Sequence, residues 1–303
     1  MVAAVARSRW SPTRRREVAL AYLLLAPALL LLAGVLAYPL AWEIWASFTS
    51  LSPLQDGAPA FVGLENYRRL LAGSQFWIAA AVTVVHALVT SVAKVVLGLG
   101  FALLLARPFR GRALVFLAVF LPWAYPASVS VIGWFWTLSP PITTSYSELM
   151  GTLKFAVDHA LGTGAWAFLS VTLFNVWRGS SFIGVLLLAG INAVPPELFE
   201  YATLESKSAW QRFWAVTVPL LRPFLALGVF LSLTTGFADL ANVWMLTAGR
   251  IVFPTVGTEA YWLAIHGGEL GLASALSLLL VPLLIAALLV LFRLLDPPER
   301  EAA

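Results

Sequence analysis

Polar and aromatic side chains cluster at two places within otherwise apolar stretches of the sequence, and they are the first candidates for chemistry. Amide, guanidinium and carboxylate groups hydrogen-bond to hydroxyl groups, and aromatic rings stack on apolar faces. Together they suit the binding of a polyhydroxylated solute such as a sugar along a path through the protein. The two clusters are Asn175, Trp177 and Arg178, and Asp239, Asn242 and Trp244.

Each cluster also has a structural interpretation. An ionisable group inside a membrane-spanning segment is costly, and it normally faces a water-filled interior or pairs with another group. Arg178 could line a path or hold spans together, while Asp239 could pair with Arg178 or Lys94, or cap a helix end. Lys94 is interpreted as structural. Asn242 is favoured over Asp239 for solute contact, because an amide needs no counter-charge.

Enzymatic chemistry has little support in the sequence. There is no cysteine, no Ser-His-Asp pattern, and no ligand spacing among the three histidines. A phosphate-binding loop requires a lysine directly after glycine, and no lysine of this chain follows a glycine. The sequence therefore predicts neither an enzyme nor a metal site, and any nucleotide hydrolysis would require a separate chain. The lysines are Lys94, Lys154 and Lys207.

The composition predicts the class of protein that must position these residues. Of 303 residues, 60% are hydrophobic and only 11% are charged, whereas soluble domains carry about 25% charged residues. A helix needs about 20 apolar residues to cross a bilayer, and six segments approach or exceed that length. Pro122 and Pro126 should kink or divide the third. The segments are Val18–Phe48, Phe76–Ala106, Ala113–Leu138, Ala165–Ile191, Pro223–Leu246 and Leu270–Leu295.

Lysine and arginine are concentrated in alternate connections, which predicts the orientation in the membrane. The basic arm, the second-to-third connection, the insert after the fourth span and the tail hold most of these residues. Both termini and the insert are therefore expected in the cytoplasm. The expected organisation is a cytoplasmic arm at 1–17, one transmembrane domain at 18–295 with the insert at 192–222, and a cytoplasmic tail at 296–303.

The insert between the fourth and fifth spans carries helix signals. Pro195 and Pro196 suit a first helical turn, and Ser208 with Gln211 forms a capping-box pattern that starts a second helix. We expect two short helices with a turn near Glu205, the second ending at the prolines 219 and 223. Aromatic residues at helical spacing share one face of this second helix: Trp210, Phe213 and Trp214.

This insert resembles the EAA loop of permease subunits in binding-protein-dependent ABC importers. Glu200, Ala202 and Glu205 match positions of the family motif, while Tyr201 replaces an alanine and Ser206 stands where glycine is expected. Further segments are similar to the carbohydrate-uptake branch of that family. They are Phe61–Tyr67, Arg107–Arg112, Phe120–Pro126 and Glu269–Ser277.

The resemblance implies an all-α, polytopic permease of about six transmembrane helices in the cell (inner) membrane. Its partners would be a second homologous permease, two ATPase subunits that bind ATP and Mg, an external solute-binding protein, and a sugar. No cofactor on this chain and no nucleic acid are expected. The residues implied in ATPase coupling are Glu200, Ala202, Glu205, Ser206, Trp210, Phe213 and Trp214.

Three alternatives remain at this point. The aromatic residues of the insert could rest in the lipid headgroup layer as an interfacial helix. The protein could be a secondary transporter driven by an ion gradient through Asp239 or Lys94, although the insert would then have no role. It could also be a membrane-embedded enzyme or a structural assembly subunit, but the sequence lacks paired catalytic groups.

Overall fold

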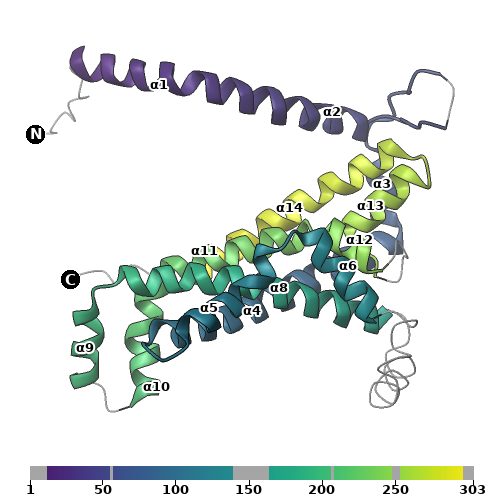
Figure 1. Ribbon diagram of the computed structural model, residues 1–303. Coiled ribbons are helices and arrows are strands. Elements are labelled where there is room, and N and C mark those ends of the chain that lie inside the picture. Colours follow the sequence, from purple (N-terminus) through teal and green to yellow (C-terminus); the bar gives the residue numbers. More distant parts are fainter. Residues whose placement is uncertain (1–11, 55–56, 139–163, 206–207, 248–252, 296–303) are drawn as a thin grey trace, which may run out of the picture.

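The structure is a computed structural model that describes residues 12–54, 57–138, 164–205, 208–247 and 253–295. The described part is helical, with one isolated antiparallel bridge between Thr49 and Phe61, which confirms the all-α prediction (Figure 1). The α-helices are α1 (Pro12–Leu32), α2 (Tyr38–Ser47), α3 (Glu65–Ala72), α4 (Ser74–Ala106), α5 (Arg112–Ala124), α6 (Ala127–Leu138), α8 (Gly164–Ala193), α9 (Pro196–Glu205), α10 (Ala209–Arg212), α11 (Val218–Phe237), α12 (Leu240–Leu246), α13 (Val256–Ile265) and α14 (Leu270–Leu295). Two π-helical turns are η1 (Ala33–Ala37) and η2 (Phe213–Thr217).

The number of spans agrees with the sequence. Five helices of the described residues are long and apolar enough to cross a membrane, and a sixth span is formed if one bent helix pair is counted. The protein is therefore a multi-pass integral membrane protein. The five helices are Leu20–Ser47, Ser74–Ala106, Ala167–Ala193, Ala209–Phe237 and Leu270–Leu291.

The bent pair is the predicted third span, and its prolines act differently. Pro122 lies inside α5 without breaking it. Pro126 follows Tyr125, whose φ of −73° and ψ of 145° are extended, as expected for a residue that precedes proline. The two halves of the span, α5 and α6, meet at an angle of 92°. The sequence therefore located the interruption, and Pro126 is its cause.

The predicted boundary between the insert and the fifth span is wrong. We expected Pro219 and Pro223 to end the second insert helix, but α10, η2 and α11 form one continuous helix from Ala209 to Phe237. Proline lacks an N–H and clashes with the carbonyl four residues earlier. The π turn η2, in which the Val218 N–H reaches the Phe213 carbonyl, widens the helix just before Pro219. The fifth span therefore begins and ends earlier than the predicted Pro223–Leu246.

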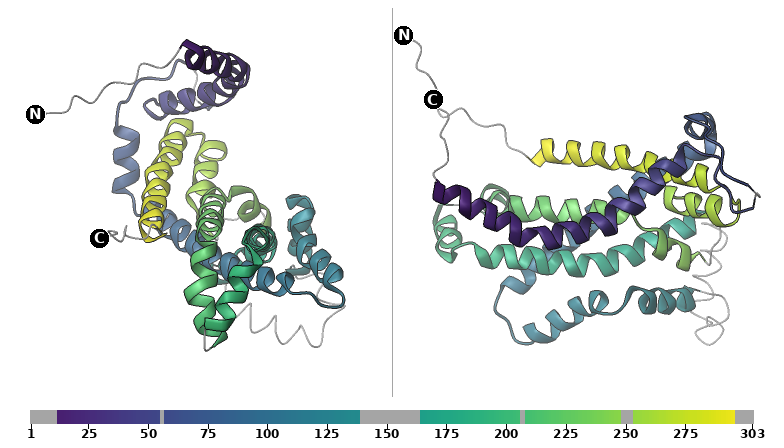
Figure 2. Two further views of the ribbon diagram at one scale, coloured as in Figure 1. Left: turned by 90° about the vertical axis from the view of Figure 1, so that its left-hand side faces the viewer. Right: turned by 90° about the horizontal axis from the view of Figure 1, so that it is seen from above.

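Helices α4 and α8 form the centre of the bundle, with α11 packed on both (Figure 2). Gly98 of α4 lies against the backbone of Gly184 of α8, so the two helices approach closely. A cluster of buried apolar side chains continues this contact: Ala102, Leu105, Ile183, Leu187 and Leu188. The first helix differs, since α1 extends away from the other helices and its leucines are exposed (Figure 1).

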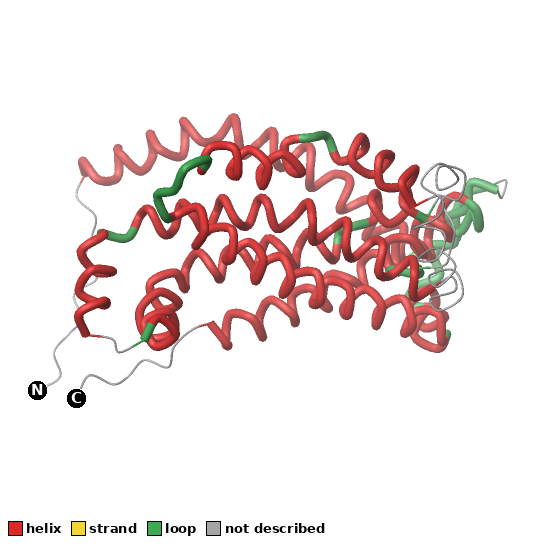
Figure 3. Tube along the Cα trace, turned by 60° about the horizontal axis from the view of Figure 1, so that its bottom comes forward, coloured by secondary structure: helices red, strands yellow, loops and turns green. Residues whose placement is uncertain are grey.

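The two ends of the molecule have different contents. The described ends of the first and last helices, Pro12 of α1 and Leu295 of α14, lie toward the same end as α9 and α10, and α3 and α13 lie toward the other end (Figures 1 and 3). Which end faces the cytoplasm stays a prediction from the distribution of basic residues. We call the end with α9 and α10 the insert end and the other the distal end.

The close approach of α4 and α8 gives a test of stability. A Cβ added at Gly98 would lie 2.9 Å from the Gly184 backbone nitrogen and 2.9 Å from Ile183 Cγ2, so Gly98→Ala must separate the helices. We expect a loss of about 1–3 kcal/mol of stability, measured as a lower melting temperature of the purified protein in detergent. Gly100→Ala is the control, because no atom lies within 4 Å of its added Cβ and alanine favours helix by about 0.5–1 kcal/mol. Equal melting temperatures for the two variants would contradict the packing argument.

Candidate functional site

The insert forms a two-helix projection at the insert end, and its observed geometry matches most of the sequence signals. Helix α9 begins at Pro196, as expected for a proline in the first turn, and ends at Glu205. Glu200 is exposed on α9, whereas Ala202 is buried. The Ser208 hydroxyl accepts a hydrogen bond of 3.1 Å from the Gln211 N–H, which confirms the predicted N-cap of the second helix. Ser206, in the predicted turn, lies outside the described residues.

Three aromatic rings form one cluster on the second helix of the insert. The Trp210 ring lies 6.2 Å from that of Phe213 and 5.6 Å from that of Trp214, and the rings of Phe213 and Trp214 are 5.1 Å apart. Trp210 is 70% exposed and Trp214 is 53% exposed. A group of exposed aromatic side chains beyond the end of a helical bundle indicates an interaction site. We call these three residues the aromatic cluster.

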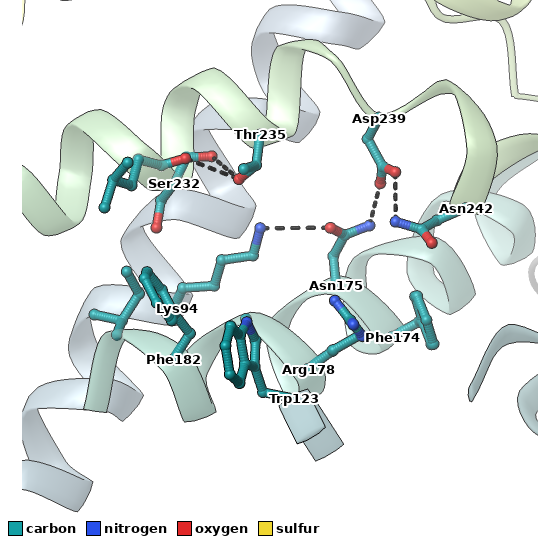
Figure 4. Close-up of a pocket in the computed structure, with 13 residues that line it drawn as sticks. Lys94, Trp123, Phe174, Asn175, Arg178, Phe182, Ser232, Thr235, Asp239 and Asn242 are labelled. Carbon is teal, nitrogen blue, oxygen red and sulfur yellow. Dashed lines mark hydrogen bonds between the residues drawn. The ribbon is translucent and has the colours of Figure 1, made fainter. Parts of the chain in front are cut away.

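A cavity of about 400 Å³ lies at the junction of α4, α8 and α11, near the break between α11 and α12 (Figure 4). Its volume is in the range of small-molecule binding sites. Aromatic and polar side chains share the lining. Its walls are formed by Lys94, Trp123, Phe174, Asn175, Arg178, Gly179, Phe182, Ile183, Leu231, Ser232, Thr235, Asp239 and Asn242.

A chain of hydrogen bonds crosses three parts of the fold in this cavity. The Lys94 ammonium donates to Asn175 Oδ1 at 3.4 Å, and Asn175 Nδ2 donates to Asp239 Oδ2 at 2.5 Å. Asn242 Nδ2 donates to Asp239 Oδ1 at 2.6 Å. Asn175 therefore bridges a buried cation and a buried carboxylate. Asp239 lines the cavity and is linked to Lys94 through Asn175, and its contact with a solute stays a prediction.

Arg178 lies at the side of the cavity where the third span bends. Its Nη2 donates to the Tyr125 carbonyl at 3.1 Å. That carbonyl belongs to the extended residue before Pro126, so the break in the α5–α6 pair leaves it available. The buried Nε of Arg178 has no hydrogen-bond partner among the described residues. Arg178 therefore holds the bent pair against α8 and keeps a donor for another group.

The structure brings four of the six predicted path residues together and places the other two elsewhere. Trp177 packs on Trp134, with ring centroids 5.6 Å apart, and it does not line the cavity. Trp244 packs on Tyr261 at 4.4 Å, also outside the cavity. Helix geometry explains why Trp177 lies outside the cavity. Trp177 is two residues from Asn175, and residues two apart do not share a helix face, whereas Asn175 and Arg178, three apart, do.

Several lining residues were missed or assigned another role in the sequence. Lys94 was interpreted as structural, yet its ammonium lies in the cavity wall. Trp123, a candidate gate residue because it lies beside Pro122, also lines it, as do Phe182 of α8 and Ser232 of α11. The signal for Lys94 was its charge within an apolar span. Phe182 and Ser232 carried no signal in the sequence, because only the packing of α8 and α11 brings them together.

The family model described as "Binding-protein-dependent transport system inner membrane component" matches residues 94–300. The chain belongs to this family. Its transport components depend on a binding protein, which argues against the alternatives of an enzyme and of an ion-driven secondary transporter. In the described residues of this transport component, no group of three His, Asp or Glu side chains could hold a metal ion.

Curated relatives cover nearly the whole transport component. The sulfoquinovosyl glycerol transport system permease protein SmoG of Agrobacterium fabrum is 31% identical, over 91% of this chain and 90% of its own. The trehalose transport system permease protein SugA of Mycobacterium tuberculosis is 32% identical, over 88% and 86%. The trehalose/maltose transport system permease protein MalF of Thermococcus litoralis is 30% identical, over 89% and 91%.

A solved structure supports the same fold. It is the crystal structure of a bacterial ABC transporter involved in the import of the acidic polysaccharide alginate. Its matching chain has a TM-score of 0.71 and 18% identity, over 95% of this chain and 98% of that one. At this level of identity the match concerns the fold alone, and it agrees with the helical bundle described above.

Proposed function

We propose that this chain is the permease subunit of an ABC importer that translocates a sugar, with a di- or oligosaccharide as the favoured cargo. An external solute-binding protein delivers the sugar, and ATP is hydrolysed with Mg on two separate ATPase subunits. A second, homologous permease completes the path across the membrane. Relatives named for trehalose, trehalose/maltose and sulfoquinovosyl glycerol transport support a sugar as cargo.

One observation carries the proposal. The insert and the cavity are joined by a single helix, because α10, η2 and α11 run without a break from Ala209 to Phe237. The aromatic cluster lies near its beginning, and Asp239 follows its end by two residues. A rigid helix transmits a displacement at one end to the other, and rigid-body motion of packed helices is a common form of transport switching.

The insert is the coupling surface in this proposal. The aromatic cluster fills a pocket of an ATPase subunit, and the exposed Glu200 offers a charge-assisted partner to a basic group there. Glu205 and Ser206 are proposed as further coupling residues, and Ala202, which is buried on α9, as a residue that supports this surface. The insert end therefore faces the cytoplasm, with both chain termini and residues 1–17 and 296–303 on the same side.

Asn175, Arg178, Asp239 and Asn242 contact the sugar in the cavity. Their amide, guanidinium and carboxylate groups hydrogen-bond to hydroxyls, and Trp123 offers an aromatic face in the same wall. Trp177 and Trp244 pack outside the cavity of this chain. We propose for them only a position next to the path of the sugar, without contact to the sugar in this cavity. The second permease would close the side of the cavity that this chain leaves open.

The proposal is tested by reconstituting the two permeases and the ATPases in liposomes with the binding protein outside. Uptake of trehalose or maltose should require ATP and Mg inside the liposomes, and it should continue when ion gradients are collapsed. The same liposomes without the binding protein are the control and should show little uptake. Uptake that stops with the gradients while ATP remains, or uptake by this chain alone, would contradict the proposal.

A further inference from the structure

The cavity contains more hydrogen-bond donors than its walls can use. Lys94 is 3% exposed, and its ammonium makes one hydrogen bond, at 3.4 Å to Asn175 Oδ1, within the described part of the chain. An ammonium has three N–H donors, so two are unused. Ser232 is 2% exposed and its hydroxyl has no partner among the described residues, and the same is true of Arg178 Nε. Figure 4 shows the Lys94 ammonium and the Ser232 hydroxyl directed into the shared space.

The carboxylate acceptors of the cavity wall are already engaged. Each carboxylate oxygen of Asp239 accepts a hydrogen bond from an amide, one from Asn175 and one from Asn242. The remaining amide oxygen of Asn175 faces Lys94. Buried polar groups are normally satisfied, so these donors are available to a ligand that supplies acceptors.

The charges in the cavity wall also favour a ligand that supplies acceptors. Of the described residues that line the cavity, Lys94 and Arg178 are cationic and Asp239 is anionic, which leaves one positive charge in excess. A charge at this depth in a membrane protein is costly unless it faces water or a counter-charge. Among the groups that this chain contributes, a neutral sugar would leave the excess charge uncompensated, whereas a ligand with one negative charge would balance it.

We propose that the cavity is selective for a sugar that carries one acidic group, and that this group binds between Lys94, Ser232 and Arg178. The inference rests on the proposed sugar-permease function and adds to it a preference for anionic over neutral sugars. The acidic group accepts hydrogen bonds from the Lys94 ammonium, the Ser232 hydroxyl and the Arg178 Nε. The sugar hydroxyls then lie toward Asn175 and Asn242, the amide side of the cavity.

The test compares two disaccharides that differ in a single group: cellobiose, and glucuronosyl-glucose with the same β-linkage, in which a carboxylate replaces a hydroxymethyl. Equilibrium binding of each is measured on the purified complex of both permeases and the ATPases, without the binding protein, so that only the membrane site contributes. Close charge pairs contribute about 1.5 kcal/mol or more, so we expect the acidic disaccharide to bind at least about 10-fold more tightly. Equal binding of the two sugars, tighter binding of cellobiose, or no binding of the acidic sugar would overturn the inference.

Two variants sharpen the test. Arg178→Gln removes the excess positive charge and should abolish the preference for the acidic sugar, while Ser232→Asp adds a carboxylate beside the unused donors and should have the same effect or reverse the preference. The control is Arg68→Gln, which removes the same charge from an exposed residue outside the cavity and should retain the preference. A preference that survives in both cavity variants would also overturn the inference.

Failure of this inference is distinguishable from failure of the proposed function. If liposomes with the complete importer take up trehalose or maltose with ATP while the complex binds both test disaccharides equally, the permease function stands and the anionic selectivity does not. If no sugar is taken up with ATP and the chain does not associate with an ATPase, the proposed function itself is wrong.

Discussion

Replacing Trp210 and Trp214 together with alanine is expected to reduce ATP-driven sugar uptake by about 100-fold or more. Both side chains are exposed in this chain, and in the assembled importer they would be anchors in a pocket of the ATPase subunit. Removing one buried aromatic anchor from an interface costs about 2 kcal/mol or more, and each 1.4 kcal/mol is a factor of ten. The measurement is the initial rate of uptake into liposomes, together with co-purification of the ATPase.

This double variant should fold and insert normally, because exposed side chains contribute little to the core. Its melting temperature in detergent is therefore expected to match that of the unaltered protein. Trp77→Ala is the matched control, since Trp77 is 58% exposed at the start of α4, at the distal end, and the substitution should leave ATPase association intact. If the double variant retained uptake and ATPase association, the aromatic cluster would be an interfacial element in the headgroup layer and not a coupling surface.

Asp239→Ala is expected to destabilise the protein and to abolish uptake. The substitution leaves Lys94, which is buried in the cavity wall, without the carboxylate to which Asn175 couples it. It also leaves the amide groups of Asn175 and Asn242 without their acceptor, and leaving a buried donor unsatisfied costs about 1–3 kcal/mol, which would appear as a clearly lower melting temperature of the purified complex. Uptake should fall to background, because Asn242 also loses the group that orients its amide.

The double variant Lys94→Met with Asp239→Leu separates stability from function. The double variant removes the buried ammonium together with the carboxylate and so leaves no uncompensated charge in the pair, although the amides of Asn175 and Asn242 still lose their acceptor. We therefore expect a melting temperature between those of Asp239→Ala and the unaltered protein, while uptake remains at background. A double variant as unstable as Asp239→Ala would show that the two charges are not coupled.

The sequence predicted the helical class, about six spans and the general place of the insert, because these depend on local signals. Runs of apolar residues, prolines and the Ser208 cap act over a few positions. The boundary of the fifth span was wrong for a physical reason. Two prolines indicated a break, but the helix continues through them. The π turn at Phe213–Thr217 widens the helix just before Pro219, and such a turn has no distinct signature in the sequence.

The site was predicted only in part, because it depends on packing between distant segments. Asn175 and Arg178 share a face by helical spacing. Asp239 and Asn242 lie near the break between α11 and α12, and their polarity within an apolar stretch made them candidates. Lys94 and Ser232 enter the same cavity only because the glycines of α4 and α8 let the helices approach and α11 packs across them. Trp177 and Trp244 were included by proximity in sequence, and their rings pack elsewhere.

The proposed function requires that the insert lies in the cytoplasm and docks into an ATPase subunit. The chain contains no cysteine, so Ala209→Cys, at an exposed residue beside the aromatic cluster, introduces a unique thiol into this subunit, which can be labelled with a membrane-impermeant maleimide. We predict no labelling in intact cells, rapid labelling in inside-out vesicles stripped of ATPase, and protection when the purified ATPase subunits are added back. Labelling from outside intact cells, or labelling in the vesicles that the ATPase subunits do not reduce, would contradict the claim.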